Sequence, residues 1–302
     1  MSKDGILVID KPENITSFKA VSMVRKYLNV KKAGHMGTLD PMATGVLPIM
    51  LGKATKVLDL IKNNNKKYIT KLKFGISTDT QDITGKIIKN ENKNICISDI
   101  EKIIKNFIGD IFQTPPMYSA IKKNGVRLYE LARKGQIIDV EKRKICINEI
   151  KILNFDNKNQ EATLMVSCSK GTYIRTLCSD IGEKLECGAT MSFLRRIESN
   201  GFGLDKSLSL EDVSEAVKSG EINKKIVSIP DLFKELGEIN ISLKQSVRFR
   251  NGGGLMIDRL KSTKTLKNGE KFKIYKENEF IGLGIVNLDK NELSVYRLFS
   301  NT

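Results

Sequence analysis

The stretch AGHMGTLDPMATGVLP, residues 33–48, contains the only histidine of the chain, three glycines and an aspartate followed by proline. Glycine and proline break helices, so the stretch is predicted to be a loop. Proline pushes the backbone of Asp40 toward extended geometry, and the nearby glycines permit turns and the close approach of a ligand. Asp40 is therefore either the start of an ordinary Asp-Pro turn or the centre of an active-site loop.

Regular secondary structure is predicted on both sides of this loop. Before it, a short apolar run stopped by Lys-Pro indicates a buried strand, and a capped apolar repeat indicates a helix. After it, a second apolar run predicts a strand, with a short helix beginning at about Lys53. The segments are GILVID (5–10), the helix capped by Ser17 with Val21, Val24 and Leu28 on one face, and VLPIMLG (46–52).

Further along the chain, two segments alternate in polarity and two repeat at helical spacing. A period of two predicts strands with one buried face, whereas apolar residues three and four apart predict helices. The strands are KKYITKLKFG (66–75), with Tyr68, Thr70, Leu72 and Phe74 on one face, and ATLMVSCS (162–169), with Ala162, Leu164, Val166 and Cys168 on one face. The helices are SDIEKIIKNF (98–107), opened by a Ser98–Glu101 capping box, and TYIRTLCSDIGEKL (172–185), with Arg175 off the apolar stripe.

Strands and helices do not alternate in strict β-α-β order. The predicted fold is therefore α+β, with a central mixed, mainly antiparallel sheet flanked by helices. This domain is predicted to span 1–230 and to carry a basic insertion at 118–143, which is equally typical of a solvated surface loop. From 238 to 302, short alternating runs separated by Asn, Gly and Asp-containing turns predict a second, small β-rich domain.

Composition limits the class of protein and its partners. Lys and Arg outnumber Asp and Glu by 51 to 35, for a formal net charge of +16. This excess predicts a polyanionic partner, most simply a nucleic acid, although a lysine-rich genome composition explains part of it. One histidine and five cysteines without a C-x-x-C pair argue against a zinc site. No apolar run is long enough for a signal peptide or a membrane span, so a cytoplasmic protein is expected.

Several common catalytic arrangements are missing from the sequence. A Ser-His-Asp triad could use only His35, and no G-x-S-x-G elbow is present. GVLPIMLGKAT fails as a phosphate-binding loop, because six residues separate Gly45 from Gly52 where four are needed, and Ala54 follows Lys53 where Ser or Thr belongs. No G-x-G-x-x-G follows a predicted strand. The protein is therefore expected to work without a cofactor and without a metal.

The loop and its surroundings resemble the catalytic domain of the bacterial TruB family of tRNA pseudouridine synthases. Five blocks agree with the family's motifs in the family's order, and together they spread over most of residues 5–200. The blocks are DKP (10–12), GHMGTLDPMATGVLPIMLGKATK (34–56), KKYI (66–69), TPPMYSAIKKNGVRLYELARKG (114–135) and SKGTYIRTLCSDIGEKLECGATMSFLRR (169–196). The C-terminal segment resembles the small RNA-binding PUA module that is often appended to such enzymes.

The resemblance implies that the protein isomerises uridine 55 in the TΨC arm of tRNA, cleaving the N1–C1′ bond and rejoining the base through C5. It places the catalytic aspartate at Asp40 and its arginine partner at Arg175. It implies nucleoside contacts for His35 beside the opened RNA loop, Tyr68 stacked on the flipped uracil, Tyr173 and Leu194. The insertion corresponds to a loop that closes over RNA, with backbone contacts expected from Lys122, Lys123, Arg127 and Arg133. A monomer is expected.

These residue types suit this reaction. Flipping a stacked uridine costs a few kcal/mol, and an aromatic face such as Tyr68 recovers roughly 1–3 kcal/mol by stacking on the base. Loss of water raises the pKa of an aspartate, and the guanidinium of Arg175 offsets that rise. A single carboxylate, Asp40, is sufficient because the uracil leaves and returns without water, whereas glycoside hydrolysis generally needs two carboxyl groups.

Other interpretations of the same residues stay open. His35 is also typical of a turn or a core, Tyr68 of a strand core, and Arg175 of a phosphate contact or a surface ion pair. The residue types do not distinguish a nucleophilic from a basic role for Asp40. The chain is also compatible with a non-catalytic RNA-binding or RNA-folding factor on the same scaffold, and with an RNA glycosylase that releases free uracil.

Overall fold

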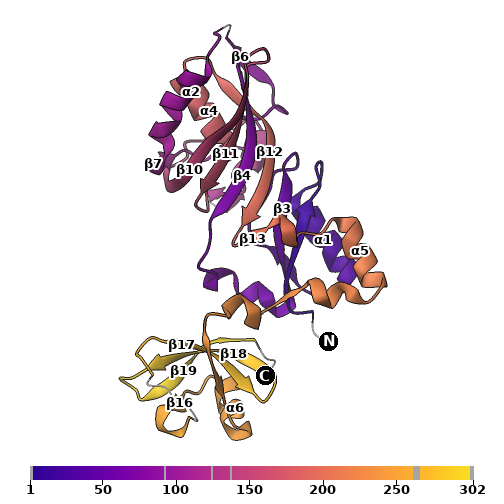
Figure 1. The fold of residues 1–302 in the computed structure, drawn as a ribbon, viewed down its shortest axis with the longest axis vertical. Coiled ribbons are helices and arrows are strands. Elements are labelled where there is room, and N and C mark those ends of the chain that lie inside the picture. Colours follow the sequence, from indigo (N-terminus) through magenta and orange to yellow (C-terminus); the bar gives the residue numbers. More distant parts are fainter. Residues whose placement is uncertain (1–2, 92, 124, 137, 261–265, 300–302) are drawn as a thin grey trace.

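The computed structural model describes residues 3–91, 93–123, 125–136, 138–260 and 266–299. The chain forms a long body built on one large sheet, followed by a smaller β-rich body at the C-terminal end (Figure 1). Within these residues, no helix combines the length and the apolar character that crossing a membrane requires.

A ten-stranded sheet forms the larger body. Its strands run in the order β14-β1-β3-β12-β4-β11-β10-β7, with β2 paired to β3 and β13 paired to β12. Their bounds are β1 Gly5–Lys11, β2 Ala33–His35, β3 Thr44–Leu51, β4 Lys66–Phe74, β7 Gly109–Gln113, β10 Arg143–Asp156, β11 Glu161–Cys168, β12 Ala189–Ser199, β13 Phe202–Gly203 and β14 Val227–Ser228. All described pairings in this sheet are antiparallel except that of β12 with β3. The predicted α+β fold with a mixed, mainly antiparallel sheet is confirmed.

Helices flank this sheet in two groups (Figure 1). Helix α1 (Ser17–Leu28) packs against α5 (Leu210–Lys218) beside β1, whereas α2 (Ile97–Ile104) and α4 (Ile174–Lys184) lie over β10 and β12. The predicted apolar stripes of α1, α2 and α4 and the predicted inner faces of β4 and β11 belong to one hydrophobic cluster. The short hairpin β5–β6 (Ile76–Thr78 and Ile87–Asn90) extends from the end of β4.

The predicted cap of α1 is wrong by one residue. Thr16, not Ser17, is the N-cap: its backbone is extended, and its hydroxyl accepts a hydrogen bond from the Lys19 N–H at 3.0 Å. Ser17 is instead buried inside the first turn. Its hydroxyl is therefore free to bond elsewhere, and it does so with the backbone of Leu39.

The predicted cap of α2 is wrong by two residues. The helix follows Cys96, whose extended backbone ends the preceding segment, and the Cys96 N–H donates to Asp99 Oδ2 at 3.0 Å. The carboxylate at this position therefore replaces the expected Ser98–Glu101 box. The short helix expected from about Lys53 is present as a 3₁₀ turn over Gly52–Lys56.

The two halves of the large sheet meet at its one parallel pairing among the described strands. There β12 joins β3 through only two residue pairs, Arg195 with Thr44 and Arg196 with Gly45. Gly45 has a φ of +105°, and a Cβ added to it would lie 2.1 Å from the carbonyl oxygen of Arg196. Only glycine fits here, because a side chain would both strain the backbone and overlap that carbonyl group.

The smaller body is a five-stranded sheet in the order β15-β17-β18-β19-β16, with one helix, α6. The bounds are β15 Gly237–Asn240, α6 Leu243–Arg250, β16 Leu255–Met256, β17 Lys271–Lys276, β18 Glu279–Asn287 and β19 Glu292–Leu298. It has its own apolar core, and a second apolar cluster joins Leu283 and Phe299 to Ile229 and Phe233 of the preceding segment. The β-rich character is confirmed, while the limits 1–230 and 238–302 and the PUA assignment stay predictions.

We expect Gly45→Ala to lower the free energy of unfolding by about 3 kcal/mol or more, because backbone strain adds to overlap with the Arg196 carbonyl. Gly109→Ala is the matched control, since Gly109 has a φ of +98° but nothing lies within 4 Å of an added Cβ. Strain alone should cost this control about 1–2 kcal/mol. Urea unfolding measures both, and equal midpoints would contradict the tight junction.

Candidate active site

Arg175 lies at the centre of a polar cluster at the N-terminal end of α4. It is only 6% exposed although it lies off the apolar stripe of the helix. Its Nε lies 2.9 Å from Asp40 Oδ2, and its Nη2 donates to Asp40 Oδ1 at 3.4 Å. One guanidinium therefore contacts both oxygens of the carboxylate, which fixes the carboxylate's orientation as well as its charge. The predicted pairing of these two residues is present in the structure.

The same guanidinium reaches two further segments. Its Nη1 donates to the Thr80 carbonyl at 3.2 Å and contacts Asp82 Oδ2 at 3.4 Å, and its Nη2 donates to the Tyr118 carbonyl at 2.8 Å. Asp82 is buried, and its Oδ1 accepts hydrogen bonds from the hydroxyls of Thr80 and Thr84. Sequence analysis missed Asp82. The only local signal is the alternation of threonine with aspartate, which is also typical of an ordinary turn.

Neighbouring groups shift the pKa of the Asp40 carboxyl in both directions. Burial raises the pKa of the Asp40 carboxyl above its ordinary value, and the nearby charge of Asp82 raises it further. The guanidinium of Arg175 and the ammonium of Lys11 lower the pKa. The side chain nevertheless remains 32% exposed. Its ionisation therefore depends on the cations beside it.

The loop around Asp40 is held by side chains from distant segments. Ser17 Oγ donates to the Leu39 carbonyl at 3.0 Å and accepts from the Leu39 N–H at 2.8 Å. Lys11 is fully buried, and its Nζ donates to the Pro41 carbonyl at 3.2 Å and to two carbonyls of its own turn. These bonds satisfy loop backbone groups that have no strand partner.

Arg196 supports the same loop from β12. It is completely buried, and its Nη1 and Nη2 donate to the carbonyls of Thr38 and Gly37 at 3.3 and 3.1 Å. Its Nε donates to the Val46 carbonyl at 2.7 Å, beside the parallel junction. Sequence analysis did not single out Arg196 for a role, because its burial depends on how β12 enters the sheet.

His35 lies at the end of β2, on the edge of this loop. Its Nδ1 accepts a hydrogen bond from the Gly37 N–H at 3.3 Å. Burial and the positive charges of Arg196 and Lys66 lower the pKa of its imidazole. His35 is therefore neutral at pH 7, and its proton lies on Nε2, where it can be donated to a partner.

Tyr68 and Leu194 lie on the neighbouring strands β4 and β12. In this register Leu194 pairs with Thr70 and Arg196 pairs with Tyr68. Tyr68 is 6% exposed and Leu194 is 5% exposed, so both are part of the core in this structure. Burial raises the pKa of Tyr68 to about 12, and the charge of Asp40 is among the smaller contributions to that rise. The side chain of Arg196, which bonds to that of Tyr68, acts in the opposite direction and lowers this pKa.

Tyr173 is the residue immediately before α4. The buried side chain of Gln113 accepts from its N–H at 2.8 Å and donates to its carbonyl at 3.0 Å. The hydroxyl of Ser119 is buried beside the Tyr173 ring and makes no hydrogen bond of good geometry with a described atom. Sequence analysis missed Gln113 and Ser119, although both lie in the conspicuous QTPPMYSA stretch.

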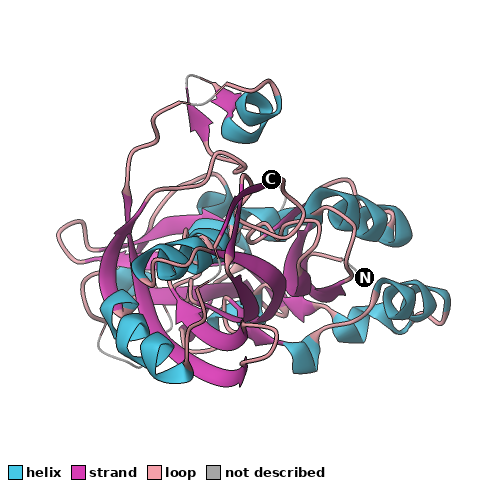
Figure 2. Cartoon of the chain, turned by 90° about the horizontal axis from the view of Figure 1, so that it is seen from above, coloured by secondary structure: helices cyan, strands magenta, loops and turns pink. Residues whose placement is uncertain are grey.

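The basic insertion stands out from the body as a short hairpin and helix (top of Figure 2). Its elements are β8 Lys122–Lys123, β9 Val126–Arg127 and α3 Leu128–Arg133. The four predicted RNA contacts are all exposed: Lys122, Lys123, Arg127 and Arg133. The guanidiniums of Arg127 and Arg133 lie 5.8 and 5.5 Å from the ring centre of Tyr129. The base of the insertion reaches the polar cluster around Arg175 through the Tyr118 carbonyl.

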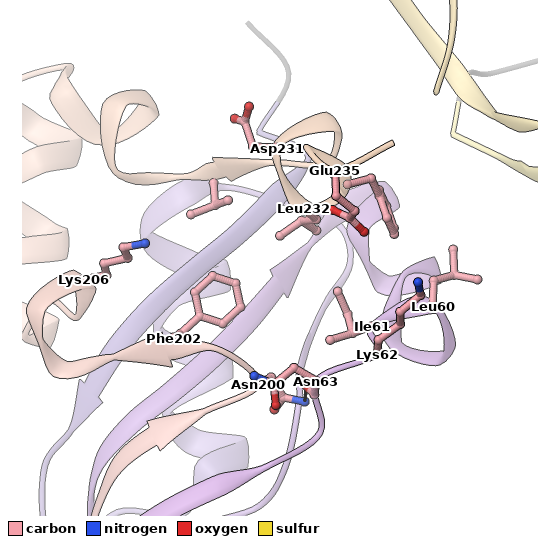
Figure 3. Close-up of a pocket in the computed structure, with 12 residues that line it drawn as sticks. Leu60, Ile61, Lys62, Asn63, Asn200, Phe202, Lys206, Asp231, Leu232 and Glu235 are labelled. Atoms are coloured by element: carbon pink, nitrogen blue, oxygen red, sulfur yellow. Dashed lines mark hydrogen bonds between the residues drawn. The ribbon is translucent and has the colours of Figure 1, made fainter. Parts of the chain in front are cut away.

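A separate hollow of about 310 Å³ lies near the segment that leads to the C-terminal body (Figure 3). Apolar side chains such as Ile61 and Phe202 line it, together with polar ones such as Lys62 and Lys206. None of the predicted nucleoside contacts lines it, so it is distinct from the cluster around Asp40. Across the described part of the chain, no group of three or more His, Cys, Asp or Glu residues could hold a metal ion.

Comparison with known sequences identifies the family. The N-terminal domain of the TruB family of pseudouridylate synthases matches residues 25–174, and the C-terminal domain of tRNA pseudouridylate synthase B matches residues 175–231. The tRNA pseudouridine synthase B of Clostridium perfringens (strain 13 / Type A) is 43% identical over 283 residues, which cover 93% of this chain and 94% of the relative. That of Clostridium tetani (strain Massachusetts / E88) is 44% identical over 282 residues, covering 93% and 95%.

Solved structures include chains with a similar fold. A Cbf5-Nop10-Gar1 complex contains a chain similar to this one with a TM-score of 0.71 and 26% identity, covering 99% of this chain and 85% of that chain. An H/ACA RNP bound to a substrate RNA containing 2′-deoxyuridine is similar in fold, with a TM-score of 0.69 and 23% identity, covering 99% and 86%. The fold and the sequence matches together define the class as pseudouridine synthase. Within that class, the chain belongs to the TruB family.

We expect Arg175→Gln to move the acid limb of the kcat/KM profile to higher pH. A carboxylate that serves as nucleophile or base must be ionised, so a catalytic Asp40 would lose activity as pH falls through its pKa. Removing the guanidinium removes the largest influence that lowers that pKa. At pH 7 the loss should be about a hundredfold. Arg195→Gln is the control, because Arg195 pairs with Asp10 and not with Asp40. An unmoved acid limb in Arg175→Gln would contradict the electrostatic role.

Proposed function

We propose that this enzyme isomerises uridine to pseudouridine at position 55 in the TΨC arm of tRNA, with Asp40 as its single catalytic carboxylate. The observation that carries the proposal is the two-point contact between Arg175 and Asp40 in a largely enclosed cluster. The names of the clostridial relatives, tRNA pseudouridine synthase B, support the substrate class.

The neighbouring carboxylate does not act as a second catalytic acid. Asp82 is buried, and its oxygens accept bonds from Thr80, Thr84 and Arg175. A glycoside hydrolase generally needs two carboxyl groups facing the scissile bond. With only Asp40 available to the substrate, the geometry favours isomerisation over release of free uracil.

In the proposed reaction, the uridine flips out of the RNA loop and enters between Tyr68 and Leu194, beside Asp40. Asp40, as nucleophile or base, promotes cleavage of the N1–C1′ bond. The detached uracil is retained and turned, C5 bonds to C1′, C5 gives up its proton and N1 takes one up, so that the product is an isomer of the substrate and no water is consumed. His35 is neutral and offers Nε2–H to the RNA loop at the vacated position.

RNA binding is proposed to extend over two other parts of the chain. The exposed basic side chains of the insertion neutralise phosphates, and the Tyr118 carbonyl connects the base of the insertion to Arg175. The C-terminal body is proposed to act as a PUA-like RNA-binding module. The enzyme is proposed to act in the cytoplasm as a monomer and to use no cofactor.

We expect Asp40→Asn to abolish isomerisation, by roughly 10³-fold or more, while tRNA affinity is retained. Tritium release from tRNA carrying C5-labelled uridine measures the reaction, and filter binding measures affinity. Asp289→Asn, the same change at an exposed carboxylate, is the control and should keep full activity. Release of free uracil by the wild type would indicate a glycosylase, and unchanged turnover in Asp40→Asn would overturn the proposed role.

Replacing Lys122, Lys123, Arg127 and Arg133 with Gln should weaken tRNA binding and flatten its salt dependence. Each phosphate contact contributes about one unit to the slope of log affinity against log salt, so the slope should fall by roughly three to four. Affinity measured between low and moderate salt tests this. An unchanged slope would show that the insertion is a solvated surface and not an RNA clamp.

A further inference from the structure

Two cationic side chains converge on one glycine of the catalytic loop. Lys66 is the first residue of β4 and lies on the same strand face as Tyr68, about 7 Å further back along the strand. A Cβ added to Gly37 would lie 3.0 Å from Lys66 Nζ and 3.6 Å from Arg196 Nη1. The ammonium and the guanidinium therefore pack against the same side of Gly37, three residues before Asp40.

No acidic group balances the charge of Lys66 within the described residues. The groups that face it are Arg196 on β12, Lys170 and the Cys168 thiol at the end of β11, and His35 on β2. Burial and the charge of Arg196 lower the pKa of Lys66 to about 8. A lysine in such surroundings is a half-buried cation among other cations, which is costly unless a partner arrives.

Other lysines of this region have hydrogen-bond or ion-pair partners for their ammonium groups. The pKa of Lys11 is also lowered to about 8, but its Nζ donates to three backbone carbonyls. Lys67 pairs with Glu198 at 3.6 Å, and Lys71 pairs with Glu161 at 3.1 Å. By contrast, the Nζ of Lys66 donates to no described atom, so its three hydrogens are available to a ligand.

We propose that Lys66 Nζ binds the RNA backbone phosphate that adjoins the flipped uridine. This inference rests on the proposed function, in which Tyr68 contacts the uracil. Lys66 and Tyr68 share a strand face at a spacing that one nucleotide spans between its base and its phosphate. Arg196 is completely buried and contributes its field, whereas Lys66 makes the contact. The missing side chain of Gly37 leaves the space in which the Lys66 ammonium lies beside the loop.

A direct test uses TΨC stem-loop RNAs in which single phosphates around the target uridine are neutralised as methylphosphonates. Binding is measured in the Asp40→Asn background, which prevents turnover. With Lys66 present, neutralising one phosphate should weaken binding about tenfold, and Lys66→Met should weaken binding of the unmodified RNA by a similar factor. In Lys66→Met, neutralising that phosphate should have no further effect.

Lys67→Met is the matched control, because it removes the same charge from the next residue, which faces the other side of β4. It should preserve the tenfold effect of the neutral phosphate. Thermal unfolding of Lys66→Met should be unchanged or shifted upward, since removing Lys66 relieves repulsion with Arg196. If Lys66→Met and the parent lose affinity equally at every modified position, the contact does not exist.

The pH dependence gives a second, independent readout. The free ammonium of Lys66 loses its proton above about pH 8, and a bound phosphate favours the charged form. RNA affinity should therefore fall several-fold between pH 7 and pH 9 in the wild type and much less in Lys66→Arg, which cannot lose its proton in this range. The RNA and the groups that face Lys66, namely Arg196, His35, Lys170 and Cys168, are the same in both proteins, so their contributions cancel. Identical profiles would overturn the proposal.

The two proposals fail in different ways. If wild-type enzyme forms no pseudouridine at position 55, the proposed function is wrong. In that case the methylphosphonate comparison still reports whether Lys66 contacts a phosphate, because it measures only binding.

Discussion

The architecture depends on a two-residue contact in the middle of the large sheet. Strand β12 joins β3 in parallel at Gly45 and joins β4 in antiparallel on its other side, so it connects two otherwise separate sets of strands. The carbonyl of Arg196 occupies the space that a side chain at residue 45 would need. The side chain of Arg196 donates to the carbonyls of Gly37 and Thr38, in the loop that precedes Asp40. Arg196 therefore contributes both to the pairing of β12 with β3 and to the conformation of the loop before Asp40.

Two buried arginines have different electrostatic effects on the site. Arg196 donates to three backbone carbonyls and also bonds to the side chain of Tyr68, but no carboxylate among the described residues forms an ion pair with it, so its charge acts on His35 and Lys66. Arg175 contacts two carboxylates, and its field keeps Asp40 ionisable in spite of burial. One half of the loop is thus strongly positive while the other half is nearly balanced. A polyanion that approaches the loop is attracted on the side of Arg196 and Lys66 and meets the Asp40 carboxylate on the other side.

The sequence was sufficient to predict those structural features that depend on local sequence patterns. Strand β4, the apolar face of α4 and the loop around Asp40 were all predictable, because alternation, helical spacing and Gly/Pro chemistry are local. Arg175 was named only through resemblance, since a basic residue off a helix stripe is usually solvated. Asp82 and Arg196 were missed because their burial arises from long-range pairing, which a single sequence does not display. The cap of α1 was misplaced because Ser17 bonds to a loop that is distant in sequence.

The order of strands in the large sheet has a consequence for synthesis of the chain on the ribosome. Strand β12 lies between β3 and β4 but is translated after both, and after β7, β10 and β11 as well. Until residue 199 has emerged, β4 lacks its partner strand on one edge, and β3 lacks its partner at Thr44 and Gly45, because β2 pairs only with residues 49–51 of β3. During that interval the unfinished polypeptide is prone to pair with other chains, and early shielding by ribosome-associated chaperones would protect it most.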